Sequence, residues 1–144
     1  MKPIYLLIGT PGSGKTWCMD QLKDKYNVLA HDKKDEHGNY YRFTDDEYIR
    51  DIDGAARTGH HPVLCETPFS ISNLYEPLTK LGHDVRPVFI IEHPNVTAQR
   101  YFVRENKAIP KGHLTRIETY KQRAKEMKAK VGTSAEILIH LKGL

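Results

Sequence analysis

The chain has 144 residues, 39% of them hydrophobic and 28% charged, with a net charge of +4. This length suits a single domain over residues 1–144, and the composition argues against a disordered or membrane-embedded chain. No apolar run approaches the roughly 18 residues that a membrane span needs, so we expect no membrane association and a cytoplasmic location.

Predicted strands and helices alternate through the first half of the chain. The continuous apolar run at residues 4–9 ends in glycine, which is typical of a buried parallel strand. A helix with Trp17 among its apolar positions is expected at residues 15–26. Further elements are a strand at 28–30, a polar loop at 33–44, a helix at 45–57 opened by a capping box of Thr44 and Glu47, and a strand at 62–65.

The alternation continues in the second half. A helix is expected from Ser70 or Ser72 to about residue 80, although Pro77 predicts that it is kinked or begins later. The remaining elements are a strand at 85–91, a helix at 95–104, a basic helix at 110–130 and a last strand at 136–141. Five strands alternating with helices predict an α/β fold, in which a parallel five-stranded sheet carries helices on both faces.

Residues 9–16 form the strongest motif. The segment Gly9-Thr10-Pro11-Gly12-Ser13-Gly14-Lys15-Thr16 matches G-x-x-x-x-G-K-[ST] and lies between a predicted strand and a predicted helix. The glycines allow successive backbone N–H groups to point at phosphate oxygens. We expect Lys15 to reach the β- and γ-phosphates and the Thr16 hydroxyl to bind Mg²⁺. The motif therefore predicts a fold of the P-loop NTPase type, with ATP and Mg²⁺ as cofactors.

Two acidic residues follow predicted strands. Asp32 comes after the second strand and Glu66 after the third. Ligands of open α/β sheets bind at the carboxyl ends of the strands, so both acids are candidates for the site. Either could hold Mg²⁺ through water or accept a proton from an attacking hydroxyl. We prefer Asp32 as the general base, and Glu66 as a group that orients the phosphate acceptor.

Two arginines indicate a small helical lid. Arg100 and Arg104 are four residues apart on one predicted helix, so they share a face. The charged segment 104–110 then interrupts two helices. Phosphoryl transfer requires cations around the phosphate oxygens and exclusion of water. We expect Arg104 to contact the ATP phosphates and Arg100 to support it.

Basic residues supply the candidate acceptor surfaces. Residues 101–130 hold nine Lys or Arg residues and three acidic ones, which favours a polyanionic partner such as DNA or RNA. In the loop at 33–44, Arg42 lies between aromatic residues, an arrangement that can stack bases and hold backbone phosphates. A solvated helix face, and aromatic residues that close over the sheet edge, are the respective structural alternatives.

These motifs, in this order, resemble a known family. The segments are GTPGSGKT, His31-Asp32, Glu66-Thr67 and Arg100-x-x-x-Arg104-x-x-Lys107-Ala108-Ile109-Pro110. They are similar to the kinase domain of phage-type polynucleotide 5′-hydroxyl kinases, which belong to the broader P-loop kinases. The resemblance implies that Lys15 and Thr16 bind ATP and Mg²⁺, that Asp32 is the general base, that Glu66 helps to place the acceptor and that Arg104 is the lid arginine.

One departure from this family concerns the acceptor. The family usually carries an arginine three residues after its aspartate, but this chain has Asp35 there. Lys33, Lys34 or Arg42 are the candidates to replace it in gripping an acceptor phosphate.

Three functions follow as hypotheses. The first is a kinase for a hydroxyl of nucleic acid, either a polynucleotide 5′-hydroxyl or a hydroxyl on a modified base. The second is a small-molecule kinase for a nucleoside, a nucleotide or another metabolite, which the missing arginine favours. The third is a P-loop ATPase or switch module without kinase activity.

Overall fold

We describe the fold from a computed structural model. It describes residues 1–34, 36–42, 44–67 and 71–144, with the residues at 33, 34 and 40–42 described by their backbone alone. Three positions used in the predictions lie outside the described residues: Asp35, Phe43, which is one of the aromatic residues beside Arg42, and Ser70, a possible start of the third helix.

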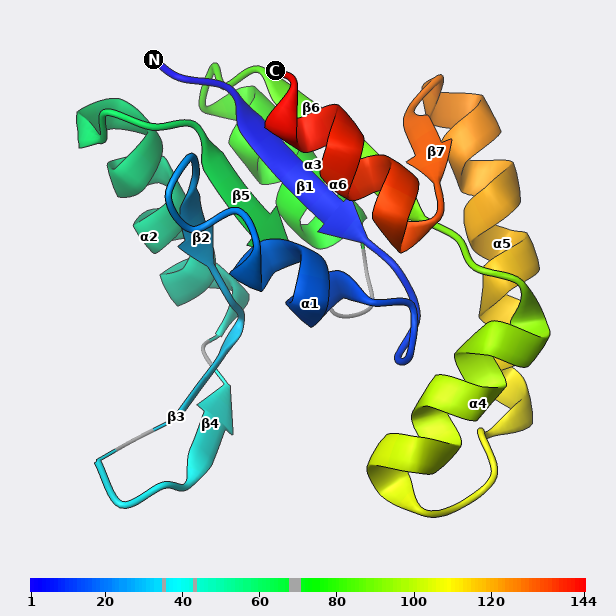
Figure 1. Cartoon of the computed structure of the whole chain (residues 1–144). Helices are drawn as coiled ribbons and strands as arrows, with labels where there is room; N and C mark the ends of the chain where they lie inside the picture. Colours follow the sequence, from blue (N-terminus) through cyan, green and yellow to red (C-terminus); the bar gives the residue numbers. More distant parts are fainter. Residues whose placement is uncertain (35, 43, 68–70) are drawn as a thin grey trace. The chain divides into compact units, whose positions relative to one another are not determined.

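Five strands form one sheet in the order β2-β5-β1-β6-β7 (Figure 1). The strands are β1 (Ile4–Ile8), β2 (Asn27–Leu29), β5 (Val63–Glu66), β6 (Val85–Ile90) and β7 (Lys130–Gly132). β2 pairs in parallel with β5, and β6 pairs in parallel with β7. Every residue of β1 is buried, which agrees with its uninterrupted apolar sequence. The parallel five-stranded sheet with its helices confirms the predicted α/β class.

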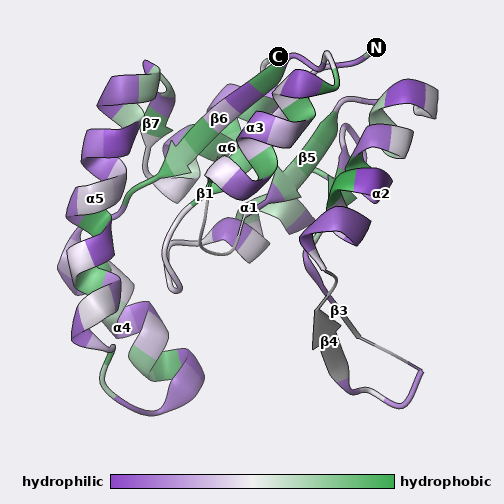
Figure 2. Ribbon diagram, turned by 180° about the vertical axis from the view of Figure 1, so that it is seen from behind, coloured by the Kyte–Doolittle hydropathy of each residue, from purple (hydrophilic) through white to green (hydrophobic). Residues whose placement is uncertain are grey.

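The chain divides into two compact units. The first comprises residues 1–6 and 23–86, and the second comprises residues 7–22 and 87–144. Figure 2 shows apolar residues along β5 and along the C-terminal part of β6. These residues belong to the buried core of the unit in which each lies.

In the first unit, helices α2 (Asp45–Thr58) and α3 (Ser72–Lys80) pack together, and α2 also packs against β5. Tyr48, Ile52 and Leu78 are among the side chains buried there. The predicted capping box is confirmed, because the Thr44 hydroxyl accepts from the Glu47 N–H and the Glu47 carboxylate accepts from the Thr44 N–H. Helix α3 begins at Ser72 and contains Pro77 within it.

The segment predicted as a polar loop contains a hairpin instead. Strands β3 (Asp32–Lys34) and β4 (Tyr40–Arg42) pair antiparallel, with Asp32 opposite Arg42 and Lys33 opposite Tyr41. The prediction of a loop was wrong for these residues. The segment is rich in polar residues, which are typical of loops, but its backbone forms a short strand pair around a turn at Gly38, where φ is 84°.

In the second unit, the helices are α1 (Lys15–Asp20), α4 (Pro94–Glu105), α5 (Lys111–Met127) and α6 (Ser134–Lys142). α1 packs on α6, and α4 contacts α5. Helix α1 ends six residues earlier than predicted, and turns cover residues 21–25. The basic helix α5 ends at Met127, since Lys128 adopts a left-handed φ of 51°. The chain then forms β7, a strand that was not predicted, since the basic helix was expected to run to about residue 130.

The predicted strand at 136–141 is a helix. Thr133 and Glu136 form a capping box that starts α6, and the buried Ile137 and Leu141 are four residues apart. Ile139, which would have shared their face in a strand, is 72% exposed. The apolar run resembled a strand, but its burial follows the helical period. Within the ranges described, none of the helices combines the length and hydropathy that crossing a bilayer requires.

Candidate nucleotide-binding site

The segment between β1 and α1 forms a tight loop. The Ser13 N–H donates to the Thr10 carbonyl over 3.0 Å. Gly12 and Gly14 have φ of 84° and 99°, in the left-handed region that glycine adopts without strain. A Cβ on Gly12 would lie 2.7 Å from the carbonyl oxygen of Thr97 in α4. The loop therefore requires glycine both for its φ angle and for its close approach to α4.

This loop and helix α4 line a pocket of about 230 Å³. Its lining consists of Thr10, Pro11, Gly12, Gly14, Lys15, Thr16, Trp17, Arg100 and Arg104. Of the residues predicted to bind nucleotide, the structure brings seven to this pocket. The other two, Gly9 and Ser13, belong to the loop but do not line the pocket. Ser13 is buried, and a Cβ added to Gly9 would lie 2.5 Å from the Ser13 hydroxyl oxygen.

Three cationic side chains line this one pocket, and they come from two elements. Lys15 is the first residue of α1, and Arg100 and Arg104 lie one turn apart on α4. Cations that converge with backbone N–H groups can neutralise the charge of a polyphosphate. The Thr16 hydroxyl on the same lining is of the ligand type that Mg²⁺ prefers, and it fits a metal held jointly with phosphate oxygens.

The two arginines have different surroundings. Arg104 donates from Nε to the Glu105 carboxylate over 3.0 Å, and its guanidinium lies 5.5 Å from the centre of the Tyr101 ring. Arg100 donates from Nη1 to the carbonyl oxygen of Ser13 over 3.1 Å. Arg104 is thus anchored on its own helix, whereas Arg100 contacts the backbone of the loop.

Glu92 lies beside this site, in contact with Arg100, and was not predicted from the sequence. It follows β6, is only 9% exposed and lies 3.4 Å from Arg100 Nη1. Burial raises the pKa of its carboxyl, but hydrogen bonds from Ser134 and the charge of Arg100 outweigh burial and hold that pKa below its ordinary value. The sequence contained evidence for Glu92. Like Asp32 and Glu66, it is an acidic residue that follows a predicted strand, so the same rule would have made it a candidate for the site.

A second pocket of about 340 Å³ shares part of this lining. Gly14, Trp17 and Arg100 belong to both pockets, and Ser134 and Ala135 from the start of α6 complete the second. From its spacing, Trp17 was predicted to be one of the apolar positions of a helix. The structure leaves it 47% exposed on the pocket lining, where its ring is available to a planar ligand.

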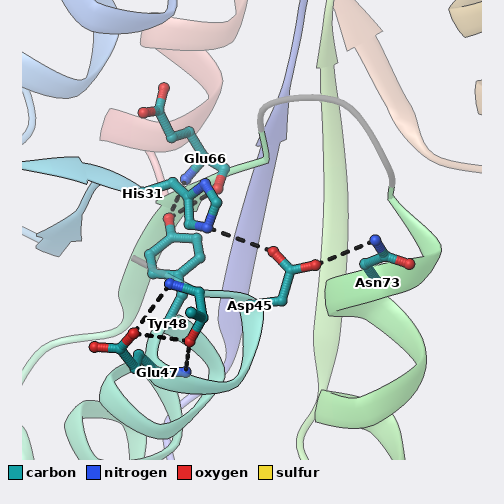
Figure 3. Close-up of polar contacts among 7 residues, drawn as sticks. His31, Asp45, Glu47, Tyr48, Glu66 and Asn73 are labelled. Atoms are coloured by element: carbon teal, nitrogen blue, oxygen red, sulfur yellow. Dashed lines mark hydrogen bonds and ion pairs between the residues drawn. The ribbon is translucent and has the colours of Figure 1, made fainter. Parts of the chain in front are cut away.

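The predicted acids lie in the first unit, near the ends of two paired strands. Asp32 begins β3, three residues after the end of β2, and Glu66 is the last residue of β5. Tyr48 of α2 lies between these strand ends. Its hydroxyl is 2.8 Å from the Glu66 carbonyl oxygen (Figure 3). The same hydroxyl is 3.1 Å from the Leu29 carbonyl oxygen. The proposed acceptor residues Arg42 and Lys33 lie in the same hairpin as Asp32, with Arg42 opposite it.

A buried histidine precedes Asp32. His31 lies against the Tyr48 ring, with ring centres 4.7 Å apart, and its Nε2 is 3.4 Å from the Asp45 carboxylate. The other Asp45 oxygen accepts from Asn73 Nδ2 over 3.2 Å, so Asp45 links α2 to α3 (Figure 3). These contacts fix the backbone just before Asp32.

Comparison with known proteins agrees with this fold. No protein-family model matches the sequence, and no curated protein matches it. Among solved structures, a gluconokinase from Sinorhizobium meliloti 1021 is similar with a TM-score of 0.58 and 20% identity, over 94% of this chain and 87% of that one. A tunicamycin resistance protein from Deinococcus radiodurans is similar with a TM-score of 0.60 and 18% identity, over 100% of this chain and 97% of that one.

The parallel sheet and the glycine-rich loop after β1 define the class of protein: the chain has the P-loop NTPase fold. At these identities the likeness establishes the fold alone. The finer resemblance to polynucleotide kinases remains a prediction from the sequence.

Proposed function

We propose that this protein is an ATP-dependent kinase that transfers the γ-phosphate to a hydroxyl group of a small molecule. The observation that carries the proposal is the convergence of Lys15, Arg100 and Arg104 with the glycine-rich loop on one pocket. Hydrolysis alone also uses such a loop, but cations from a separate helix suit a site that closes over a transferred phosphoryl group.

Each pocket residue has a part in holding the donor. The backbone N–H groups of the loop and Lys15 bind the phosphates, and Thr16 provides a hydroxyl for Mg²⁺. When bound, Mg²⁺ neutralises charge that builds up on the phosphate oxygens. When ATP is bound, the Arg104 guanidinium contacts a phosphate group in place of the Glu105 carboxylate, because the phosphate carries more negative charge. The pocket lined by Trp17 and Ala135 is the candidate place for the adenine ring.

Asp32 is the proposed general base, with Glu66 as the alternative. The carboxylate accepts the proton of the acceptor hydroxyl, the hydroxyl oxygen forms a bond to the γ-phosphorus, and the bond from that phosphorus to the β–γ bridging oxygen breaks to release ADP. Tyr48 supports either assignment, because its hydroxyl contacts the last residue of β2, three residues before Asp32, and Glu66 itself at the end of β5.

Three observations favour a small acceptor over nucleic acid. Asp35 occupies the position where the polynucleotide kinases that this chain resembles carry a phosphate-gripping arginine. On the basic helix, Lys121 pairs with Glu118 at 3.1 Å and Arg123 with Glu126 at 3.7 Å, so part of its charge is compensated within α5. The similar structure described as a gluconokinase bears the name of a kinase for a small molecule.

A nucleic-acid acceptor is the second candidate, because residues 101–130 still carry six more basic than acidic residues. Such an excess would attract a polyanion in a salt-dependent manner. Both candidates use the same donor site and differ only in the acceptor.

The test is transfer of label from γ-labelled ATP to a panel of acceptors. The panel contains sugars and sugar acids, nucleosides, nucleotides and a 5′-hydroxyl oligonucleotide, and Lys15→Ala is the inactive control. We expect label on a small hydroxyl compound and none with Lys15→Ala. Labelled oligonucleotide alone would establish the second candidate. Release of inorganic phosphate without transfer to any acceptor would instead indicate a P-loop ATPase or switch and overturn the proposal.

A further inference from the structure

A single buried carboxylate joins the elements around the glycine-rich loop. Glu92 Oε1 accepts from the backbone N–H of Ser134 over 2.8 Å and from the Ser134 hydroxyl over 2.7 Å. The same oxygen lies 3.4 Å from Nη1 of Arg100. A carboxylate at this depth needs such partners, because an unpaired buried charge is strongly destabilising. Glu92 therefore ties the end of β6 to the start of α6 and to helix α4.

Arg100 extends this contact into the loop. Its Nη1 donates to the Ser13 carbonyl oxygen, and a Cβ on Gly14 would lie 3.3 Å from that nitrogen and 2.9 Å from the Ser134 Cβ. The Ser13 carbonyl and the Gly14 N–H belong to one planar peptide group and point in opposite directions. When Arg100 holds the carbonyl, it also sets the direction of the Gly14 N–H, and Gly14 lines the phosphate pocket.

We propose that Glu92 is a positioning residue for the nucleotide site. It acts through Arg100, and the inference rests on the proposed binding of ATP at the loop. The Arg100 side chain is long and 43% exposed, so without a fixed charge beside it the guanidinium would sample many directions. Glu92 restricts it to the Ser13 carbonyl, and thereby holds the Gly14 peptide in the orientation that binds phosphate.

The test measures ATP binding and needs no acceptor. Trp17 is the only tryptophan and lines the pocket, so its fluorescence reports nucleotide binding directly. Titrations with ATP and Mg²⁺ compare the wild type, Glu92→Gln, Arg100→Met and the double variant. Glu92→Gln keeps an oxygen acceptor for Ser134 and removes only the charge. We expect about tenfold weaker binding for Glu92→Gln, as is typical when a charge-assisted contact in a partly exposed site is lost.

The double variant separates positioning from general stability. If Glu92 acts through Arg100, Glu92→Gln has no further effect once Arg100 is replaced, and the double variant binds ATP like Arg100→Met. The matched control is Glu136→Gln, because Glu136 also caps the start of α6, through the Thr133 N–H at 3.1 Å, without contacting Arg100. This control should bind ATP within about twofold of the wild type.

Two results would overturn the inference: wild-type affinity in Glu92→Gln, or losses that multiply in the double variant. If Glu92→Gln does not fold, Glu92→Asp serves instead, since it keeps the charge but withdraws it by one methylene. Its binding should then fall between that of the wild type and Arg100→Met, and wild-type binding in Glu92→Asp would count against the proposal. A wild-type protein that fails to bind ATP would overturn the proposed function itself.

Discussion

The hydroxyl of Tyr48 and the backbone of Glu66 approach each other through two hydrogen bonds. The hydroxyl lies 2.8 Å from the Glu66 carbonyl oxygen as donor, and it accepts from the Glu66 N–H over 3.2 Å. Burial raises the pKa of Tyr48 well above its ordinary value, so the hydroxyl keeps its proton. A hydroxyl has one proton, so the Leu29 carbonyl at 3.1 Å competes for it with Glu66. Tyr48 thus joins the ends of β2 and β5.

Tyr48→Phe should therefore loosen both strand ends while keeping the packed ring. The variant leaves the Glu66 N–H and two carbonyl groups without this partner, and we expect unfolding to become easier by about 1–3 kcal/mol. Urea unfolding measures this change. If Asp32 and Glu66 have the roles proposed, kcat should also fall, with little change in the KM for ATP.

The matched control is Tyr75→Phe in α3, a half-buried tyrosine whose hydroxyl has no hydrogen bond within the described ranges. Equal stability losses in the two variants would show that the Tyr48 hydrogen bonds contribute nothing specific.

Gly12→Ala should disable the phosphate loop. The left-handed φ costs a non-glycine residue roughly 1–2 kcal/mol, and the added methyl group would also collide with the Thr97 carbonyl. We expect a lower melting temperature and loss of ATP binding. Gly54→Ala is the contrasting control, because Gly54 lies within α2 and a Cβ added there would meet nothing within 4 Å, so this change should stabilise the protein by up to about 1 kcal/mol. Normal ATP binding by Gly12→Ala would contradict the assigned role of the loop.

Arg104→Met should reduce phosphoryl transfer without affecting the fold. The Arg104 side chain is 54% exposed and pairs with Glu105 on the surface, so the loss of stability should be small. The kcat/KM for transfer should fall at least about tenfold, because a cation at the developing phosphate charge acts mainly in the transition state. Steady-state kinetics test this expectation against Lys125→Met on α5. An unchanged kcat/KM would contradict the proposed role of Arg104 in phosphoryl transfer.

The pair of Asp53 and His83 predicts a pH dependence of stability. His83 Nε2 lies 2.6 Å from the Asp53 carboxylate, and this hydrogen bond, aided by Arg57, lowers the pKa of Asp53. A depressed pKa contributes stability above the unfolded value of about 4, and this contribution is lost as the pH falls through the folded value. Asp53→Asn should lower the free energy of unfolding by about 1 kcal/mol at neutral pH, and stability should then decrease less as the pH falls.

Urea unfolding midpoints measured from pH 7 down to pH 3 would show this, with the exposed Asp51→Asn as control. A profile parallel to that of the wild type would refute the assignment.

Reversing the charges of Lys121 and Arg123 to glutamate distinguishes the two acceptors. Their ion pairs within α5 are solvent-exposed and contribute little to stability. For a small acceptor we expect an unchanged KM and an unchanged kcat. A sharp rise in the KM for an oligonucleotide, with unaltered ATP affinity, would instead establish α5 as a nucleic-acid surface.

Local signals in the sequence were sufficient where one segment contains its own determinants. The glycine-rich loop, the capping box at Thr44 and the buried strand β1 are specified by residues that are neighbours in the chain. The same holds for Arg100 and Arg104, whose spacing places them on one face of any helix that contains them.

The last helix shows where local reasoning failed. Ile137, Ile139 and Leu141 alternate with other residues as in a strand, and only the packing of α6 on α1 decides that Ile139 is exposed. β7 is similar, because three residues acquire strand geometry through their pairing with β6 rather than through their own sequence.

The sequence by itself determined that this chain has a glycine-rich loop of the P-loop type, an alternating α/β order and an arginine-bearing helix, because each depends on residues close together in the chain. Only the tertiary structure decided that Glu92 contacts both Arg100 and Ser134 next to that loop. The same is true of the contacts by which Tyr48 joins two strand ends. These contacts include pairs separated by 18 and 42 positions in the chain. A buried charge or hydroxyl needs partners in space, and the chain order alone does not show which distant groups will supply them.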